Sequence, residues 1–241
     1  MNDELIKVVK NYQPDPKVTS VLKDQKILFM VGPTSSGKNT IINLLLEKAN
    51  YFYKVITYTT RSPRINNGVM EINHQDYNFI GINRAKQFIQ EKRFIELAIF
   101  NNQIYGTVLD QFQEAARLNL MPLLSVDVQG IEKYQSICPE MIAIFLLPQS
   151  LDQLIERYYI RHPKNKITAL DLKKRLRFAL DELESLINNN YYYPILNNDS
   201  EFAVNSILRI IDNPQSQPDR TELITLAKKI RHQIETYLTD F

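Results

Sequence analysis

The sequence predicts an α/β protein with a mostly parallel sheet covered by helices. Short apolar runs of strand length alternate with segments of helical periodicity, which is the order that parallel strands with crossover helices require. A loop containing two glycines joins the first of these runs directly to the first helical segment. The chain has 241 residues and is 44% hydrophobic, so it is long and apolar enough to bury a core of this kind.

Each element follows from its pattern. The expected strands are Ile27–Val31, Lys54–Thr57, Phe94–Phe100, Leu123–Asp127, Met141–Leu147 and Pro194–Asn197. After the first strand, a helix is predicted by the 3.6-residue spacing of Ile41, Ile42, Leu45 and Leu46. The other expected helices are Arg84–Glu91, Val108–Leu118, Leu151–Ile160, Ala169–Asn188 and Glu201–Ile211.

Two segments flank this alternating pattern, residues 1–25 at the start and 214–241 at the end. The stretch 212–219 is polar and contains two prolines, which is typical of a linker. Beyond it, a helix over 220–238 is predicted by an apolar face made of Leu223, Leu226, Ile230, Ile234 and Tyr237. We expect each flanking segment to dock on the core domain, to mediate dimerisation or to bind a partner. Both a monomer and a homodimer fit the sequence.

Composition excludes several classes of protein. The 29 basic and 27 acidic residues nearly cancel, so no overall charge favours nucleic acid or a membrane surface. Cys138 is the single cysteine, which rules out an intrachain disulfide. The start of the chain lacks the apolar run of a signal peptide, and no apolar run approaches the ~18 residues of a membrane span. We therefore expect a cytoplasmic protein.

The loop that follows the first strand carries a phosphate-binding pattern. It reads Gly32-Pro33-Thr34-Ser35-Ser36-Gly37-Lys38, and the spacing G-x4-G-K between a strand and a helix is that of a Walker A loop. The glycines let backbone N–H groups turn toward phosphate oxygens, and the helix N-terminus adds its partial positive charge. Lys38 would place an ammonium on the β- and γ-phosphates of ATP. The alternative is an ordinary strand–helix turn with a solvated lysine.

The loop departs from the usual pattern after the lysine. A Ser or Thr normally follows and binds Mg²⁺ through its hydroxyl, whereas here Asn39 follows and Thr40 comes next. The Asn39 carbonyl is a possible Mg²⁺ ligand, and the alternative is a metal held mainly by phosphates and water. The sequence identifies no definite metal ligand.

The motifs that follow resemble, in their order, those of guanylate kinase, the P-loop enzyme that phosphorylates GMP. They are VITYTTRSPR from Val55, DYNFI (76–80), FIELA (94–98), YGT (105–107) and LLSVDVQG (123–130). The resemblance implies a parallel-sheet P-loop core over about 26–213. It also implies a small mixed α/β lobe for GMP at about 57–107 and a helical lid at about 157–175.

For the GMP phosphate, the resemblance implies Arg61, Arg64, Tyr77 and Tyr105 as ligands. The chemistry agrees, because two guanidiniums three residues apart can grip one phosphate and two phenols can donate to the same oxygens. Alternatively, the two arginines are solvated loop charges. The interval between Arg64 and Asp76 is about four residues longer than the family's, so Tyr77 must reach the phosphate from a longer loop.

For the guanine base, the resemblance implies Thr57, Glu96, Thr107 and Asp127. Glu96 is a single carboxylate inside an apolar run, where a charge is costly unless it is paired. A carboxylate can accept from both guanine N1–H and the 2-amino group, and adenine offers neither donor, so such a site should reject AMP. The alternative for Glu96 is a solvent-facing residue on an edge strand. Asp127 could serve either guanine or the metal region, although the family's acidic residue two positions before it is Ser125 here.

The segment 157–177 is strongly basic. The resemblance implies that Arg157, Arg161 and Arg175 contact the ATP phosphates, and that Asn197 lies near the adenine ring. The alternative for the basic residues is a solvated helix face. Arg157 and Arg161 are four residues apart and therefore share a face of their helix.

Together these features predict phosphoryl transfer from ATP to GMP, and to dGMP, with Mg²⁺ as cofactor. The acceptor is an anionic phosphate oxygen, so the reaction requires no general base. Lys38, Arg61, Arg157, Arg161 and Arg175 would neutralise the charge of the transferring group. Two alternatives remain: a guanylate-kinase-like interaction module with weak catalysis, and a P-loop kinase with another phosphorylated acceptor.

Overall fold

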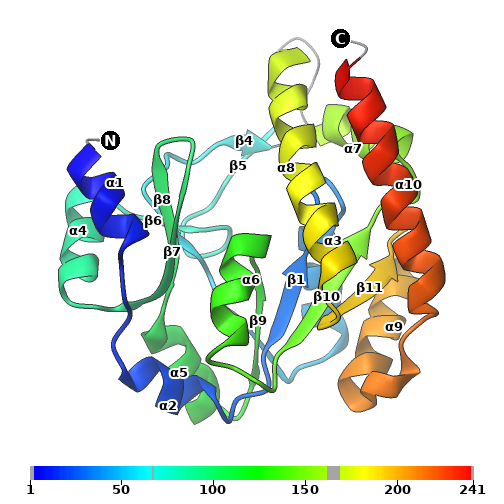
Figure 1. Cartoon of the computed structure of the whole chain (residues 1–241). Coiled ribbons are helices and arrows are strands. Elements are labelled where there is room, and N and C mark those ends of the chain that lie inside the picture. The colour runs from blue at the N-terminus through cyan, green and yellow to red at the C-terminus, as the bar shows by residue number, and fades with distance from the viewer. Residues whose placement is uncertain (1–2, 67, 162–168, 240–241) are drawn as a thin grey trace. The chain divides into compact units, whose positions relative to one another are not determined.

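The protein is described by a computed structural model, which covers residues 3–66, 68–161 and 169–239 (Figure 1). The chain forms two compact units whose segments alternate in sequence. Unit 1 comprises residues 1–27, 51–124 and 129–141. Unit 2 comprises residues 28–50, 125–128 and 142–241.

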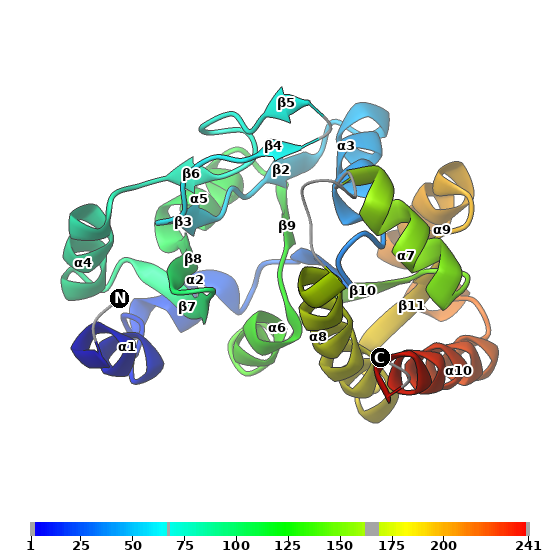
Figure 2. The ribbon, with the colours of Figure 1, turned by 90° about the horizontal axis from the view of Figure 1, so that it is seen from above.

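Unit 2 contains three parallel strands, β1 (Leu28–Val31), β10 (Ile142–Leu147) and β11 (Tyr192–Leu196). Leu28 pairs with Ile142, and Ala143 pairs with Tyr192. Every residue of β1 and β10 is buried, as expected for strands covered on both faces. The helices are α3 (Lys38–Lys48), α7 (Leu151–Arg161), α8 (Ala169–Asn188), α9 (Ser200–Asp212) and α10 (Arg220–Thr239), with a 3₁₀ turn at Pro214–Ser216. Figure 2 shows α3 and α9 on one face of these strands and α8 and α10 on the other.

Unit 1 contains a four-stranded sheet in the order β6–β3–β8–β7. Its strands are β3 (Tyr58–Thr59), β6 (Asn78–Phe79), β7 (Phe94–Phe100) and β8 (Gln103–Val108), and β7 and β8 form an antiparallel hairpin. A separate parallel pair joins β2 (Phe52–Lys54) to β9 (Met121–Ser125), and a short hairpin joins β4 (Ile65–Asn66) to β5 (Val69–Met70). The helices are α1 (Asp3–Lys10), α2 (Lys17–Leu22), α4 (Ile82–Gln90), α5 (Leu109–Arg117) and α6 (Val128–Gln135).

The parallel pairings confirm the predicted α/β class. The strands expected at Ile27–Val31, Phe94–Phe100 and Met141–Leu147 are present within one residue at each end, and the helix expected at 169–188 matches α8. The strand expected at Leu123–Asp127 is shifted by two residues toward the C-terminus, because β9 begins at Met121 and ends at Ser125. No helix in the described part of the chain is long and apolar enough to cross a bilayer.

The strand expected at Lys54–Thr57 is wrong. β2 ends at Lys54, and the ladder continues only through a bond from the Val55 N–H to the Leu123 carbonyl, 2.9 Å. At Ile56 the Gln111 side chain replaces a neighbouring strand: it accepts from the Ile56 N–H at 2.8 Å and donates to the Ile56 carbonyl at 2.9 Å. A side chain that satisfies both backbone groups ends the strand there.

Both flanking segments pack on the unit to which they belong. In unit 1, α1 lies against β7 and α4 (Figure 1) and buries Leu5 and Val9. In unit 2, α10 lies along α8 (Figure 2) and buries Leu223, Ala227 and Ile230.

Candidate active site

The predicted phosphate loop lies between β1 and α3, and its backbone requires both glycines. Gly32 has φ +132° and Gly37 has φ +98°, conformations that other residues rarely adopt. A Cβ on Gly32 would come within 2.5 Å of the Leu146 carbonyl oxygen, and one on Gly37 would collide with the Asn197 amide. The two positions therefore admit no side chain.

The start of α3 is arranged to receive an anion. No described side chain caps the helix, and its first turn contains no acidic residue. The buried hydroxyl oxygens of Ser35 and Ser36 have no hydrogen-bond partner within the described residues. The N–H groups that a helix presents at its N-terminus, together with these two hydroxyls, fit the oxygens of a phosphate chain.

Lys38 is turned back onto the loop. Its ammonium donates to the Gly32 carbonyl and, at 3.0 Å, to the Pro33 carbonyl. These bonds hold the ammonium against the backbone of the loop, so an anion bound by the loop would meet this charge.

Sequence reasoning missed one carboxylate, that of Glu182, which interacts electrostatically with Lys38 of the phosphate loop. Glu182 on α8 interacts with Lys38, Asp127 and Arg175, and burial raises its pKa from 4.5 to about 7. Asp127 raises this pKa further, whereas Lys38 and Arg175 lower it. Glu182 lies seven residues after Arg175 and therefore on the same helix face, which is the signal that could have identified it.

Arg157 and Asn197 connect the loop to α7. The side-chain amide of Asn197 donates to the Ser36 backbone carbonyl at 2.7 Å. The backbone carbonyl of Asn197 accepts from Arg157 Nη2 at 2.8 Å. Arg157 Nη1 is buried and has no partner in the described part of the chain, and burial lowers the pKa of this guanidinium. Asn197 thus supports the loop directly, and its predicted position near an adenine ring stays a prediction.

Of the other two predicted lid arginines, the structure describes the side chain of Arg175 but not that of Arg161. Arg175 lies beside the Tyr158 phenol, whose pKa is raised by burial and lowered by Arg175. Arg161 ends α7, but its side chain and residues 162–168 lie outside the described residues.

In unit 1, two of the residues predicted for the GMP phosphate, Tyr77 and Tyr105, lie near a third, Arg61. Arg61 and Glu71 form a bidentate ion pair at 2.6 and 3.0 Å, and each side chain is only 7% exposed. The guanidinium carbon lies 4.8 Å from the ring centroid of Tyr77, and the Tyr77 and Tyr105 rings are 6.1 Å apart. Burial by itself lowers the pKa of the Arg61 guanidinium. The hydrogen bonds and the charge of Glu71 outweigh this effect, so the pKa is raised overall. The structure therefore brings Arg61, Tyr77 and Tyr105 together.

Glu71 also fixes the neighbouring loop by accepting from the Arg64 N–H at 2.8 Å. The Arg64 side chain itself is exposed. Sequence reasoning missed Glu71, which lies within the lengthened interval between Arg64 and Asp76 and has no pattern of its own.

The predicted guanine residues Glu96 and Thr107 face each other across the β7–β8 hairpin. Glu96 is 7% exposed, and its Oε1 accepts from the Thr107 N–H at 3.0 Å and from the Thr107 hydroxyl at 3.2 Å. The Thr107 hydroxyl also bonds to the phenol of Tyr134, a fully buried residue that sequence reasoning missed. The alternative of a solvent-facing Glu96 is therefore wrong.

Comparison with known proteins identifies the family. The family model described as guanylate kinase matches residues 24–214. The chain belongs to the guanylate kinase family.

Individual relatives agree with this assignment. A guanylate kinase of Prochlorococcus marinus is 34% identical over 187 residues, which covers 78% of this chain and 97% of the relative. One of Caldanaerobacter subterraneus is 31% identical and covers 89% of this chain and 98% of the relative. The crystal structure of guanylate kinase from Anaplasma phagocytophilum has a TM-score of 0.60 at 23% identity, covering 85% of this chain and 96% of that one, and it supports the fold.

The remaining predicted residues have these positions in the guanylate kinase fold. Thr57 is partly exposed in unit 1, before β3. Unit 2 contains Pro33 and Thr34 in the loop, Asn39 and Thr40 exposed in the first turn of α3, and Asp127 exposed after β9. Asp127 is thus in the unit that carries the phosphate loop, and its role toward guanine stays a prediction.

The residues present fit a magnesium ion bound together with phosphates. No group of three or more His, Cys, Asp or Glu side chains is placed to hold a metal within the described residues. Glu182 nevertheless interacts electrostatically with a second carboxylate, that of Asp127, and with Lys38. Mg²⁺ is typically held in proteins by one or two carboxylates, substrate phosphates and several waters.

Proposed function

We propose that this chain transfers the γ-phosphoryl group of ATP to GMP and dGMP, giving ADP and the corresponding diphosphate. Family membership supports the reaction class. The observation that carries the choice of acceptor is the buried Glu96 carboxylate, fixed by two bonds from Thr107.

Glu96 would read the guanine base. Its bonds to Thr107 both end on Oε1 and hold the carboxylate plane in one orientation. A carboxylate held in this way can accept from guanine N1–H and the 2-amino group together. Adenine would leave the buried charge without these donors, and an uncompensated buried charge is strongly unfavourable.

Arg61 would bind the acceptor phosphate. Of its five N–H donors, two bond to Glu71 and one bonds to the Ser62 carbonyl at 2.8 Å. As far as the described residues go, two donors therefore remain for phosphate oxygens. Tyr77, Tyr105 and Arg64 would add further donors around the same group.

On the donor side, residues 32–40 and Lys38 would hold the ATP phosphates. Phosphate oxygens would replace the Gly32 and Pro33 carbonyls as acceptors for the Lys38 ammonium. Arg157, whose Nη1 has no partner among the described residues, would neutralise charge on the transferring group together with Arg161 and Arg175. The attacking oxygen is already anionic, so no side chain has to remove a proton.

Asp127 and Glu182 would hold Mg²⁺ on the side of Lys38, and Asn39 is a further possible ligand. When bound, this ion supplies charge neutralisation and orientation of the phosphates. The chain's own carboxylates would keep it beside the loop.

An assay of ADP release tests the proposal. The protein is mixed with ATP and Mg²⁺ and with GMP, dGMP, AMP, CMP or UMP in turn. We expect turnover with the two guanine nucleotides alone. Binding of GMP without turnover would favour the interaction-module alternative, and turnover with another acceptor would contradict the role of Glu96.

Glu96→Gln is the corresponding variant. An amide keeps the shape but removes the charge and one acceptor, so kcat/KM for GMP should fall on the order of 100-fold. Glu114→Gln, an exposed change on α5 in the same unit, should leave kcat/KM within twofold. An unchanged value for Glu96→Gln would contradict the proposed recognition of guanine.

A further inference from the structure

Strand β7 is irregular next to Glu96. Phe94 pairs with Val108, but Glu96 pairs with Thr107, so two steps along β7 correspond to one step along β8. Ile95 is therefore the extra residue of a β-bulge. Such a bulge changes the face of the sheet to which the following side chains point.

The bulge determines the face on which Glu96 lies. In a regular strand, residues 94 and 96 would point to the same face. Phe94 and Leu97, three residues apart, instead share one apolar cluster with Leu5 and Val9 of α1. Without the bulge, Glu96 would share the face of Phe94 and point into this apolar cluster, away from its partner Thr107.

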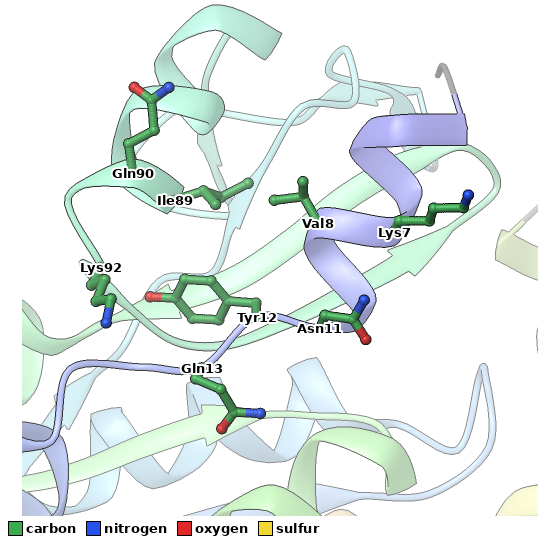
Figure 3. Close-up of a pocket in the computed structure, with 8 residues that line it drawn as sticks. All are labelled: Lys7, Val8, Asn11, Tyr12, Gln13, Ile89, Gln90 and Lys92. Atoms are coloured by element: carbon green, nitrogen blue, oxygen red, sulfur yellow. The ribbon is translucent and has the colours of Figure 1, made fainter.

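Tyr12 bonds to the backbone at the start of the bulge. Its hydroxyl donates to the Phe94 carbonyl at 2.8 Å, and its ring packs against the same apolar cluster. In Figure 3 the ring points away from α1 toward the segment that carries Lys92. Burial raises the pKa of Tyr12 to about 12, so the hydroxyl remains a donor at any physiological pH.

We propose that the N-terminal segment 3–12 holds the bulge at Ile95, and that Tyr12 is a positioning residue for the guanine specificity of Glu96. This segment precedes the part of the chain that matches the family, which begins at residue 24. The inference rests on the proposed role of Glu96. It adds a determinant of acceptor binding that lies outside the family domain.

Tyr12→Phe tests the proposal, because it removes the hydroxyl and keeps the ring in the cluster. We expect KM for GMP to rise about fivefold, the effect of one lost hydrogen bond, while kcat and KM for ATP stay within twofold. A general loss of structure would change all three constants. Tyr53→Phe is the matched control, since the Tyr53 hydroxyl makes no hydrogen bond within the described residues.

Hydrogen exchange supplies a readout that does not depend on catalysis. The Thr107 N–H donates to Glu96, so its exchange should become faster in Tyr12→Phe and not in Tyr53→Phe. Faster exchange with a raised KM for GMP supports the proposal. Unchanged exchange overturns it, and so does an unchanged KM.

Glu96→Gln, measured in parallel, distinguishes a failure of the Tyr12 proposal from a failure of the proposed function itself. If Glu96→Gln raises KM for GMP and Tyr12→Phe does not, the positioning role of Tyr12 fails while the proposed function stands. If neither variant changes this KM, the guanine role of Glu96 fails, and the role of Tyr12 fails with it.

Discussion

Glu182 makes the stability of the free protein depend on pH. Burial raises its pKa from 4.5 to about 7, with Asp127 and Asp181 adding to this effect and Lys38 and Arg175 opposing it. The folded protein therefore holds this proton more tightly than the unfolded chain does. The resulting stabilisation is complete below pH 4.5 and is lost as the pH rises toward 7.

Glu182→Gln should remove this dependence. Without nucleotide or Mg²⁺, the free energy of unfolding of the unmodified chain should fall, relative to the variant, by up to roughly 3 kcal/mol between pH 4.5 and 7. Solvent at this partly exposed side chain will reduce the difference. Urea titrations at several pH values measure it, with the exposed Glu222→Gln as control. Parallel pH profiles for Glu182→Gln and the unmodified chain would contradict the assignment.

Individual site residues were predictable where a pattern surrounds them. Lys38 follows from the G-x4-G-K spacing, and Glu96 follows from a lone charge within an apolar run. Glu71 and Tyr134 have no such signal. Glu71 lies in an irregular loop and is noticeable only through its bond to Arg61, and Tyr134 only through its bond to the distant Thr107. These hydrogen bonds are tertiary contacts that a single sequence does not encode locally.

At the scale of elements, strands with strong apolar runs were predicted well and short polar ones were not. The run Phe94–Phe100 matches β7 without error, although its bulge at Ile95 leaves no trace in the apolar pattern. Lys54–Thr57 failed because the Gln111 side chain, 55 residues away from Ile56, ends the strand. β8 was missed because its polar residues interrupt the apolar pattern.

Arg220 joins three elements at the end of α8. It donates to the Tyr192 carbonyl at 2.6 Å and to the Asn189 carbonyl at 2.8 Å, and burial lowers its pKa. The guanidinium thereby satisfies carbonyl groups where α8 ends and β11 begins, at the favourable end of the helix dipole.

Arg220→Ala should therefore destabilise the protein by about 2 kcal/mol, since charge-assisted bonds to partly buried carbonyls are lost. Urea unfolding followed by circular dichroism measures this free energy. Lys229→Ala, an exposed change on the same helix, should have little effect. Equal stabilities of the two variants would show that α10 does not depend on this cap.

At the scale of the whole molecule, the residues proposed for ATP and for the GMP phosphate belong to different compact units. Each ligand should then stabilise the protein through its own set of residues. A ligand at 100 times its Kd contributes about 2.7 kcal/mol.

Lys38→Met should lose most of the thermal stabilisation given by ADP and should keep that given by GMP. Thermal unfolding with each ligand alone measures both shifts. Lys48→Met, at the exposed end of the same helix, is the control and should keep both. Loss of the GMP shift in Lys38→Met would contradict the separation of the two sets of residues.

The bond between Asn197 and Ser36 also has a consequence for protein synthesis. It joins residues 161 positions apart, and Asn197 lies near the end of the last strand. A growing chain contains Gly32–Lys38 early but cannot make this bond before residue 197 has been added to it. The phosphate loop therefore reaches its final form only after about four fifths of the polypeptide has been made. Nascent chains that end before Asn197 should lack a mature nucleotide site.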